Sequence, residues 1–142
     1  MDLMFNLNYF ISSFMFAIIT ITQIVTYPLF YMVGKDQFPI YHSNYVYRIS
    51  LIAAPVMLVE ILLAIVLVSI SMSYLTISNF LVIFFIFLST FFIQVPIHEK
   101  IKLEPNFELF NRLNKTNWIR TLLWFLKCII SFNILNEGII WI

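Results

Sequence analysis

The chain has 142 residues, of which 62% are hydrophobic and 11% are charged, and its mean hydropathy is +0.97. Ordinary soluble domains carry about 25% charged residues, so this chain has too little polar surface to cover a water-soluble globule and is predicted to lie in a bilayer. The net charge of +1 favours neither nucleic acid nor an acidic partner, and the single cysteine, Cys128, excludes a disulfide framework within the chain.

Two apolar segments in the first half of the chain predict membrane-spanning helices. The first covers about residues 10–30; no Lys or Arg precedes it, so we expect a retained span rather than a signal peptide. The second covers about residues 47–70, with an interfacial extension back to Tyr41. Each is close to the ~20 residues that cross about 30 Å of hydrocarbon.

Two more spans are predicted in the second half, at about residues 80–97 and 117–135. Helices are favoured over barrel strands because a helix satisfies its own backbone hydrogen bonds and because no segment alternates between apolar and polar residues. The sequence therefore predicts an all-α fold, an integral membrane four-helix bundle that forms a single domain over residues 1–142.

Basic residues predict the orientation of this bundle. Most of them flank the loops between spans 1 and 2 and between spans 3 and 4: Lys35, Arg48, Lys100, Lys102, Arg112, Lys115 and Arg120. The positive-inside bias places both loops in the cytoplasm and both termini on the extracytoplasmic side, in a bacterial inner (plasma) membrane.

Polar residues inside the spans are expected to face the bundle interior, because exposing them to lipid is costly. Those that fall toward the cytoplasmic end come from all four spans: Gln23, Tyr27, Tyr45, Arg48, Gln94, His98, Asn117 and Arg120. This convergence is the strongest functional signal in the sequence, and it predicts a polar cluster that binds a substrate or ligand.

Glu60 and Lys127 lie at about the same depth, near the middle of spans 2 and 4. Because either charge alone would be costly in the bilayer, we expect them to form a structural ion pair rather than a proton relay. The position of Glu60 also excludes it as a partner of His42 in a metal site of two histidines and one carboxylate. The two lie 18 residues apart on one predicted helix, a separation of roughly 27 Å.

His42 and His98 remain candidates for a shared site, since both lie near the cytoplasmic interface on neighbouring spans. They could ligate a metal or a haem, or act as catalytic acid and base. The alternative, that both make ordinary hydrogen bonds at the interface, stays open.

Arg48 and Arg120 support a second hypothesis. Two guanidinium groups with Gln94 and Asn117 between them could hold a phosphate or carboxylate head group. The alternative is that the arginines extend to lipid phosphates or cap loop carbonyls.

Four stretches of the chain carry a resemblance: QIVTYPLFYMVGKDQFPIYHSNYVYRI, PVMLVE, QVPIHEKI and RLNKTNWIRTLLW. Together they resemble a group of small, uncharacterised bacterial four-span membrane proteins, from which no activity carries over. More remotely, the layout is similar to the anthrone-oxygenase-like membrane proteins, which have four spans and an Asn/Arg segment that opens the last helix. That resemblance implies oxidative chemistry on a lipophilic substrate and assigns no catalytic residue.

Two functional hypotheses follow. The first is an intramembrane oxidoreductase or oxygenase acting on a hydrophobic, aromatic or quinone-like molecule, with His98 and His42 as its catalytic or metal-binding residues. The second is a non-enzymatic accessory protein that binds a lipid or a partner subunit. Membrane lipids are expected partners under both, and a homo-oligomer stays open. A transporter is less favoured because the sequence has no internal repeat.

Overall fold

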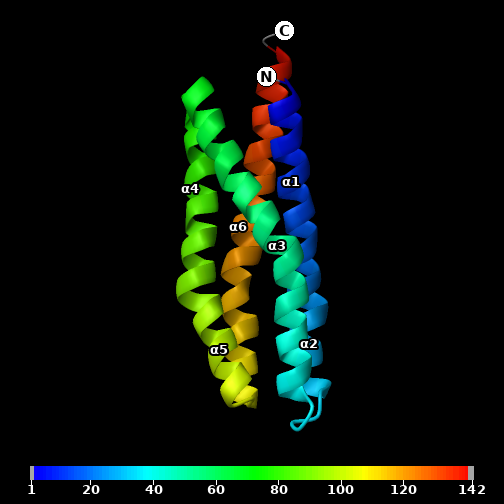
Figure 1. The fold of residues 1–142 in the computed structure, drawn as a ribbon. Helices are drawn as coiled ribbons and strands as arrows, with labels where there is room; N and C mark the ends of the chain where they lie inside the picture. Colours follow the sequence, from blue (N-terminus) through cyan, green and yellow to red (C-terminus); the bar gives the residue numbers. More distant parts are fainter. Residues whose placement is uncertain (1, 141–142) are drawn as a thin grey trace.

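The computed structural model describes residues 2–140, which form four long helical rods joined by short connections (Figure 1). The first rod comprises α1 (Asp2–Ile21), the π-helical turn η1 (Thr22–Thr26), α2 (Tyr27–Leu29) and the 3-10 turn η2 (Phe30–Met32). The second rod is α3 (Phe38–Ile70). The third comprises α4 (Tyr74–Ser89), the π-helical turn η3 (Thr90–Gln94) and α5 (Val95–Leu103), and the fourth is α6 (Phe107–Ile140). The predicted all-α four-helix bundle is confirmed.

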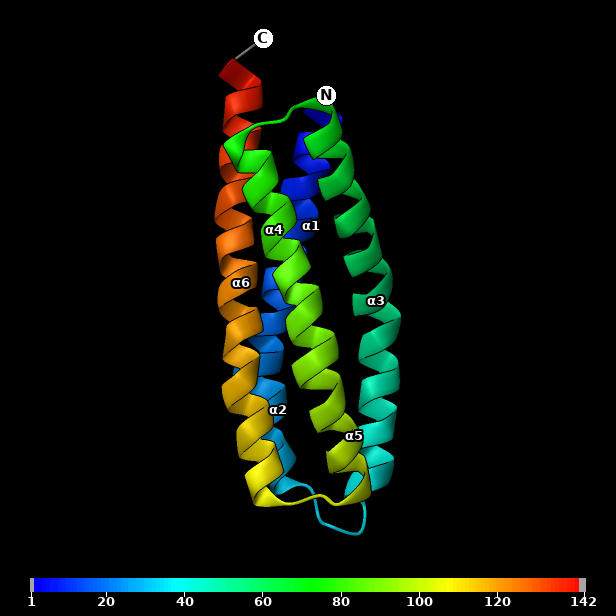
Figure 2. The same ribbon diagram turned by 90° about the vertical axis from the view of Figure 1, so that its left-hand side faces the viewer.

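The rods run alternately up and down, and each packs against its neighbours in the chain (Figures 1 and 2). α6 closes the ring by packing along α1 as well as α4. The beginning of α1, the connection 71–73 and the end of α6 lie at one end of the bundle, which we name the terminal end. The connections 33–37 and 104–106 lie at the opposite end, the loop end.

Each rod contains a segment that is long and apolar enough to cross a bilayer: Leu3–Met32, Phe38–Ile70, Tyr74–Leu103 and Phe107–Asn136. The outward faces carry large apolar side chains such as Phe10, Phe92 and Leu122, each more than half exposed, whereas polar side chains such as Asn79 and Lys127 are buried. An apolar exterior around a polar interior is the arrangement of a multi-pass membrane protein.

The helices extend beyond the apolar runs that predicted them. α3 begins at Phe38, slightly before the predicted extension to Tyr41, and α6 begins at Phe107 rather than near residue 117. Polar caps lie at the beginnings of α4 and α6: Ser73 forms a capping box at α4, and the Asn106 side chain accepts a hydrogen bond of 2.9 Å from the Leu109 amide of α6. The apolar run marks the part of a helix that suits hydrocarbon, whereas these caps stabilise the polar ends of the two helices.

Two π-helical turns interrupt the first and third rods at the same distance before a proline. η1 begins at Thr22 and precedes Pro28, and η3 begins at Thr90 and precedes Pro96. A widened turn accommodates proline, which lacks an N–H donor and crowds the carbonyl group four residues earlier. Pro55, in contrast, lies within the uninterrupted helix α3.

A middle layer of apolar side chains fills the bundle between its two halves. At its centre the fully buried Trp124 of α6 belongs to one packed cluster with Met15 of α1, Met57 of α3 and Ile86 of α4. Along α6 this layer separates Arg120, on the loop-end side, from Lys127, on the terminal-end side. Two groups of interior polar residues are therefore kept apart by an apolar barrier.

Candidate functional site

The first polar group surrounds Lys127, on the terminal-end side of the middle layer. The Lys127 ammonium nitrogen lies 3.1 Å from Glu60 Oε1 and donates to Ser12 Oγ at 2.9 Å and to Asn79 Oδ1 at 3.1 Å. A longer contact of 3.5 Å reaches Asn8 Oδ1. All of these side chains are fully buried. The donors of the ammonium group are therefore satisfied inside the bundle.

Further hydrogen bonds link the residues around Lys127 to one another. Ser12 donates to Glu60 Oε1 at 3.0 Å, and Asn8 Nδ2 donates to Ser131 Oγ at 3.0 Å. We name the whole set the lysine centre: Asn8 and Ser12 of α1, Glu60 of α3, Asn79 of α4, and Lys127 and Ser131 of α6. The structure brings the predicted pair of Glu60 and Lys127 together, and their structural role stays a prediction.

Three members of the lysine centre, Asn8, Ser12 and Asn79, were not predicted from the sequence. Asn8 and Asn79 lie just outside the apolar runs at 10–30 and 80–97, in the parts of the helices that extend beyond those runs. A spacing signal was nevertheless present. Asn8 and Ser12 are four residues apart, as are Lys127 and Ser131, and this spacing places each pair on one helix face.

The second polar group lies on the loop-end side, where the Gln23 amide of η1 is held by α6. Its Oε1 atom accepts hydrogen bonds from Asn117 Nδ2 at 2.9 Å and from Thr121 Oγ1 at 3.4 Å. Its Nε2 atom donates to the backbone carbonyl of Asn114 at 3.1 Å and also to the Asn114 side-chain oxygen. Gln23 and Asn117 were both predicted as ligand-binding residues. In the structure most of their hydrogen-bonding groups are instead bonded to other residues of the bundle.

Asn117 also positions the charged group of this region. Its Oδ1 atom accepts a hydrogen bond of 3.2 Å from an Arg120 terminal nitrogen, while Arg120 Nε is buried without a hydrogen-bond partner. On the facing rod, Gln94 donates to Thr116 Oγ1 at 3.0 Å and leaves its own Oε1 atom buried and without a partner. These two side chains are oriented by α6 and still have unused hydrogen-bonding groups.

Tyr27, His98 and His42 form a continuous hydrogen-bonded chain near the loop end. The Tyr27 hydroxyl lies 3.0 Å from His98 Nε2, and His98 Nδ1 lies 2.8 Å from His42 Nε2. The aromatic rings of Phe30 and Phe38 pack against His42, whose Nδ1 atom is buried without a partner. The structure thus brings together the two histidines that the sequence singled out and adds Tyr27 to them.

The two histidines are hydrogen-bonded to each other, and metal ligation by them stays a prediction. The nitrogens that face each other are hydrogen-bonded, and the remaining His98 nitrogen is bonded to Tyr27. Among the described residues, no group of three or more His, Cys, Asp or Glu side chains is arranged to hold an ion. Ligation by this pair would require the rings to turn away from each other.

A cavity of about 390 Å³ lies in the loop-end half of the bundle, lined by residues of all four rods. The polar part of its wall consists mainly of Tyr27, Tyr45, Gln94, His98 and Arg120. The apolar part comes from the middle layer and its surroundings, and includes Met15, Ile19, Met57 and Phe87. Of the residues predicted for a functional cluster, these five polar ones share the cavity wall.

The cavity opens sideways between α3 and the third rod. Its lining includes residues that are also exposed on the outer surface: Ser50, Ala54 and Leu58 on α3, and Phe91 and Val95 on the facing rod. Two of the α3 residues, Ser50 and Ala54, are small and leave space between the helices. The opening lies between two segments that are long and apolar enough to cross a bilayer, and the exposed Glu99 also belongs to the lining.

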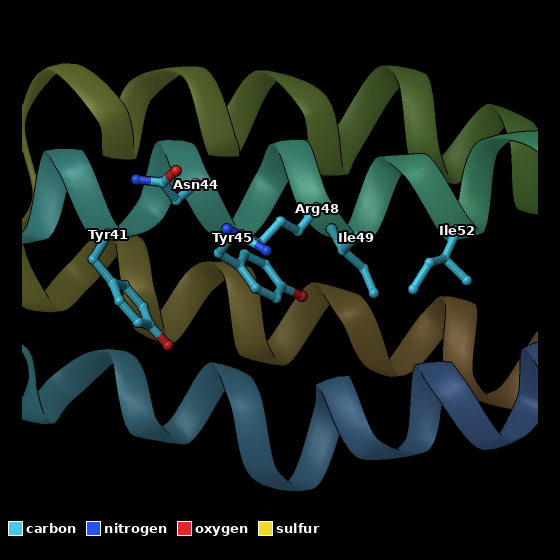
Figure 3. A pocket seen from close by; sticks show the side chains of 6 residues that line it. All are labelled: Tyr41, Asn44, Tyr45, Arg48, Ile49 and Ile52. Carbon is cyan, nitrogen blue, oxygen red and sulfur yellow. The ribbon is translucent and has the colours of Figure 1, made fainter.

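Arg48 does not belong to this cavity. It lies in a shallow groove on the outer face of α3, lined by Tyr41, Asn44, Tyr45, Arg48, Ile49 and Ile52 (Figure 3). Tyr45 lines both the groove and the cavity, whereas the exposed Arg48 lines only the groove. The predicted meeting of Arg48 with Arg120 is therefore not observed, because α3 carries Arg48 on its outer surface.

The two polar groups offer different chemistry. The lysine centre is a closed set in which cation, carboxylate and neutral oxygens satisfy one another almost completely, with Glu60 Oε2 left without a partner. The loop-end group borders a cavity and includes a cation, two phenols and an imidazole, so it is the part of the molecule equipped to receive a ligand. Comparisons with protein-family models, curated proteins and solved structures find no match to this chain.

Proposed function

We propose that this protein binds a single lipophilic small molecule, which enters the cavity sideways from the bilayer. The molecule's polar end faces Arg120, Tyr27 and Tyr45, and its apolar part lies against the middle layer. The observation that carries the proposal is one cavity with a lateral opening, an apolar floor and converging polar side chains.

The size of the cavity narrows the choice of ligand. Its volume of about 390 Å³ is near the low end of the roughly 300–1,000 Å³ range of ligand pockets. The cavity therefore suits one chain or a small ring system rather than a phospholipid with two chains. The hydrogen bonds that Arg120 donates to Asn117 and that Gln94 donates to Thr116 fix the polar wall in advance, which lowers the ordering cost of binding.

The test places a larger side chain on α3 where it would occupy part of the cavity. Ala54→Phe adds a ring at a lining residue that is exposed, so the packing of the core should be unaffected. Val59→Phe places the same ring on the same helix at an exposed residue outside the cavity lining. Binding of 1-aminoanthracene to the full-length protein in lipid nanodiscs, corrected for empty nanodiscs, should weaken at least tenfold in A54F only. Equal binding by both variants and the unsubstituted protein would refute a ligand role for the cavity.

An enzyme that converts the bound molecule is the second candidate, and the chain of Tyr27, His98 and His42 favours it. His98 borders the cavity and is hydrogen-bonded on both sides, so the chain could give or take a proton at the ligand. The resemblance to anthrone-oxygenase-like proteins supports oxidative chemistry on such a molecule. An absorption spectrum and metal analysis of the purified protein test the metal and haem versions of this hypothesis. Replacing both histidines tests the acid–base version: unchanged turnover would contradict it.

We propose further that the loop end faces the cytoplasm and that the termini face the opposite side of a bacterial inner membrane. The support for this topology is the cluster of basic residues around connections 33–37 and 104–106.

A further inference from the structure

We infer that the molecule held in the cavity is an acid, and that its ionised head group supplies the counter-charge that Arg120 lacks. This inference rests on the proposed function and names the class of ligand. A carboxylate on a single apolar chain or ring system is the simplest member of that class.

Arg120 has an incomplete set of hydrogen-bonding and charged partners inside the bundle. Its terminal nitrogen donates to the neutral Asn117 side chain at 3.2 Å, and its Nε atom is buried without a partner. The ion pair of Glu60 and Lys127 is the only one among the described residues, so none of their carboxylates lies within 4.0 Å of Arg120. The guanidinium group therefore has no counter-charge from the described chain.

The lysine centre shows what this bundle does with an interior cation that needs no ligand. Lys127 has one carboxylate and several neutral oxygens around it, and it does not line the loop-end cavity. Arg120 has only neutral oxygens near it, from Asn117 and Tyr27, and a cavity beside it. A cation in a low-dielectric interior is costly without a counter-charge, and a guanidinium group binds carboxylates in a well-matched, two-pronged geometry.

Glu99 is the one carboxylate among the residues that line the cavity, and it does not fill this role. It lies on α5, is exposed on the outer surface and forms no ion pair with Arg120. The Tyr45 phenol, in contrast, lines the cavity together with Arg120 and can donate a hydrogen bond to an anionic head group. Tyr27 can do the same when His98 Nε2 carries the proton of the bond between them.

The decisive experiment compares an acid with a neutral molecule of equal length. Dodecanoic acid and dodecan-1-ol compete with 1-aminoanthracene for the full-length protein in uncharged lipid nanodiscs at pH 8, with concentrations corrected for partition into empty nanodiscs. We expect the acid to bind at least tenfold more tightly than the alcohol. Equal affinities would overturn the inference and leave the proposed function standing, whereas displacement by neither molecule would count against both. Because this comparison needs no substitution, it does not depend on whether a variant folds.

Three variants then assign the preference to Arg120. Arg120→Gln should reduce the ratio of acid to alcohol affinity to about one, and Arg120→Lys should keep part of the preference because it keeps the charge. Arg112→Gln is the matched control, since Arg112 is exposed on the same helix and does not line the cavity. A full preference in R120Q, or its loss in R112Q, would overturn the assignment to Arg120.

Discussion

Lys127 lies completely buried among side chains of all four rods, and its surroundings explain how a membrane-spanning segment tolerates an ammonium group. Glu60 supplies the counter-charge at 3.1 Å, and Ser12 and Asn79 supply neutral oxygens at 2.9 and 3.1 Å. Removing a single partner leaves the others buried with unsatisfied hydrogen-bonding groups, which is more costly than replacing the whole set.

Lys127→Met should therefore destabilise the protein strongly. It leaves the Glu60 carboxylate without its counter-charge, and breaking such a buried pair costs about 3–5 kcal/mol. The measurement is the free energy of unfolding in a detergent titration, made on K127M, on Glu60→Gln and on the double variant. The double variant should lose at least about 1 kcal/mol less than the sum of the single losses. Strictly additive losses would show that the two groups do not interact.

Asn79→Leu tests a residue of the lysine centre that the apolar pattern did not predict. The change removes the oxygen that accepts from Lys127 and Ser131, and hydrogen bonds inside membrane bundles contribute about 0.6–1.7 kcal/mol each. We expect a loss of about 1–2 kcal/mol in the unfolding free energy. Asn133→Leu makes the same change at an exposed residue of α6 and should alter stability by less than about 0.5 kcal/mol. Similar losses in both variants would mean that Asn79 has no special role.

Individual residues also show how far the sequence can predict the site. The depth of Glu60 and Lys127 could be counted along their helices, and the structure brings the two together. Arg48 and Arg120 have similar predicted depths, yet one is exposed in an outer groove and the other borders the cavity. Depth follows from counting residues, but the direction of a side chain also depends on the rotation of each helix within the bundle.

At the scale of the helical element, the two π-helical turns position the amides of the loop-end group. Gln23 is the second residue of η1, and Gln94 is the last residue of η3. Each turn widens the helix before a proline, so the residues after it are rotated relative to a regular α-helix. The prolines were visible in the sequence, whereas the widened turns were not, because Pro55 shows that a proline can also lie in an uninterrupted helix.

Deletion of Phe92 tests whether the widened turn sets the face of the residues that follow. Phe92 lies within η3 and points outward, with an exposed fraction of 76%. The widened turn holds one residue more than a regular α-helical turn, so removing one residue should restore the regular helix and leave His98 on the same face, toward Tyr27 and His42. We expect 1-aminoanthracene binding to change less than twofold.

Deletion of Phe84 provides the contrast to this variant. Phe84 is an exposed residue of the regular helix α4, so its loss should rotate the residues that follow by about 100° and lower binding at least tenfold. If both deletions lower binding equally, the π-helical turn does not hold the extra residue in this way.

At the scale of the whole molecule, the bundle follows from the sequence more directly than the cavity does. Four apolar runs with short connections lead to four antiparallel rods, because neighbouring helices in a chain with short loops pack side by side. The cavity depends on local differences in side-chain size, such as Ser50 and Ala54 on α3 facing larger residues on the third rod. The periodic pattern of apolar residues in the sequence does not predict this difference in side-chain size, because the difference matters only where two particular helix faces meet.

The orientation of the whole bundle can be tested by labelling cysteines at its two ends. In a Cys128→Ala background, Met72→Cys places a thiol in the connection at the terminal end and Asn106→Cys places one at the loop end. Basic residues are held on the cytoplasmic side during insertion, so a membrane-impermeant maleimide should label residue 72 in intact cells or in spheroplasts. It should label residue 106 only after the membrane is permeabilised. The reverse pattern would place the loop end outside, and the basic residues near it would then need another explanation, such as contact with an anionic partner.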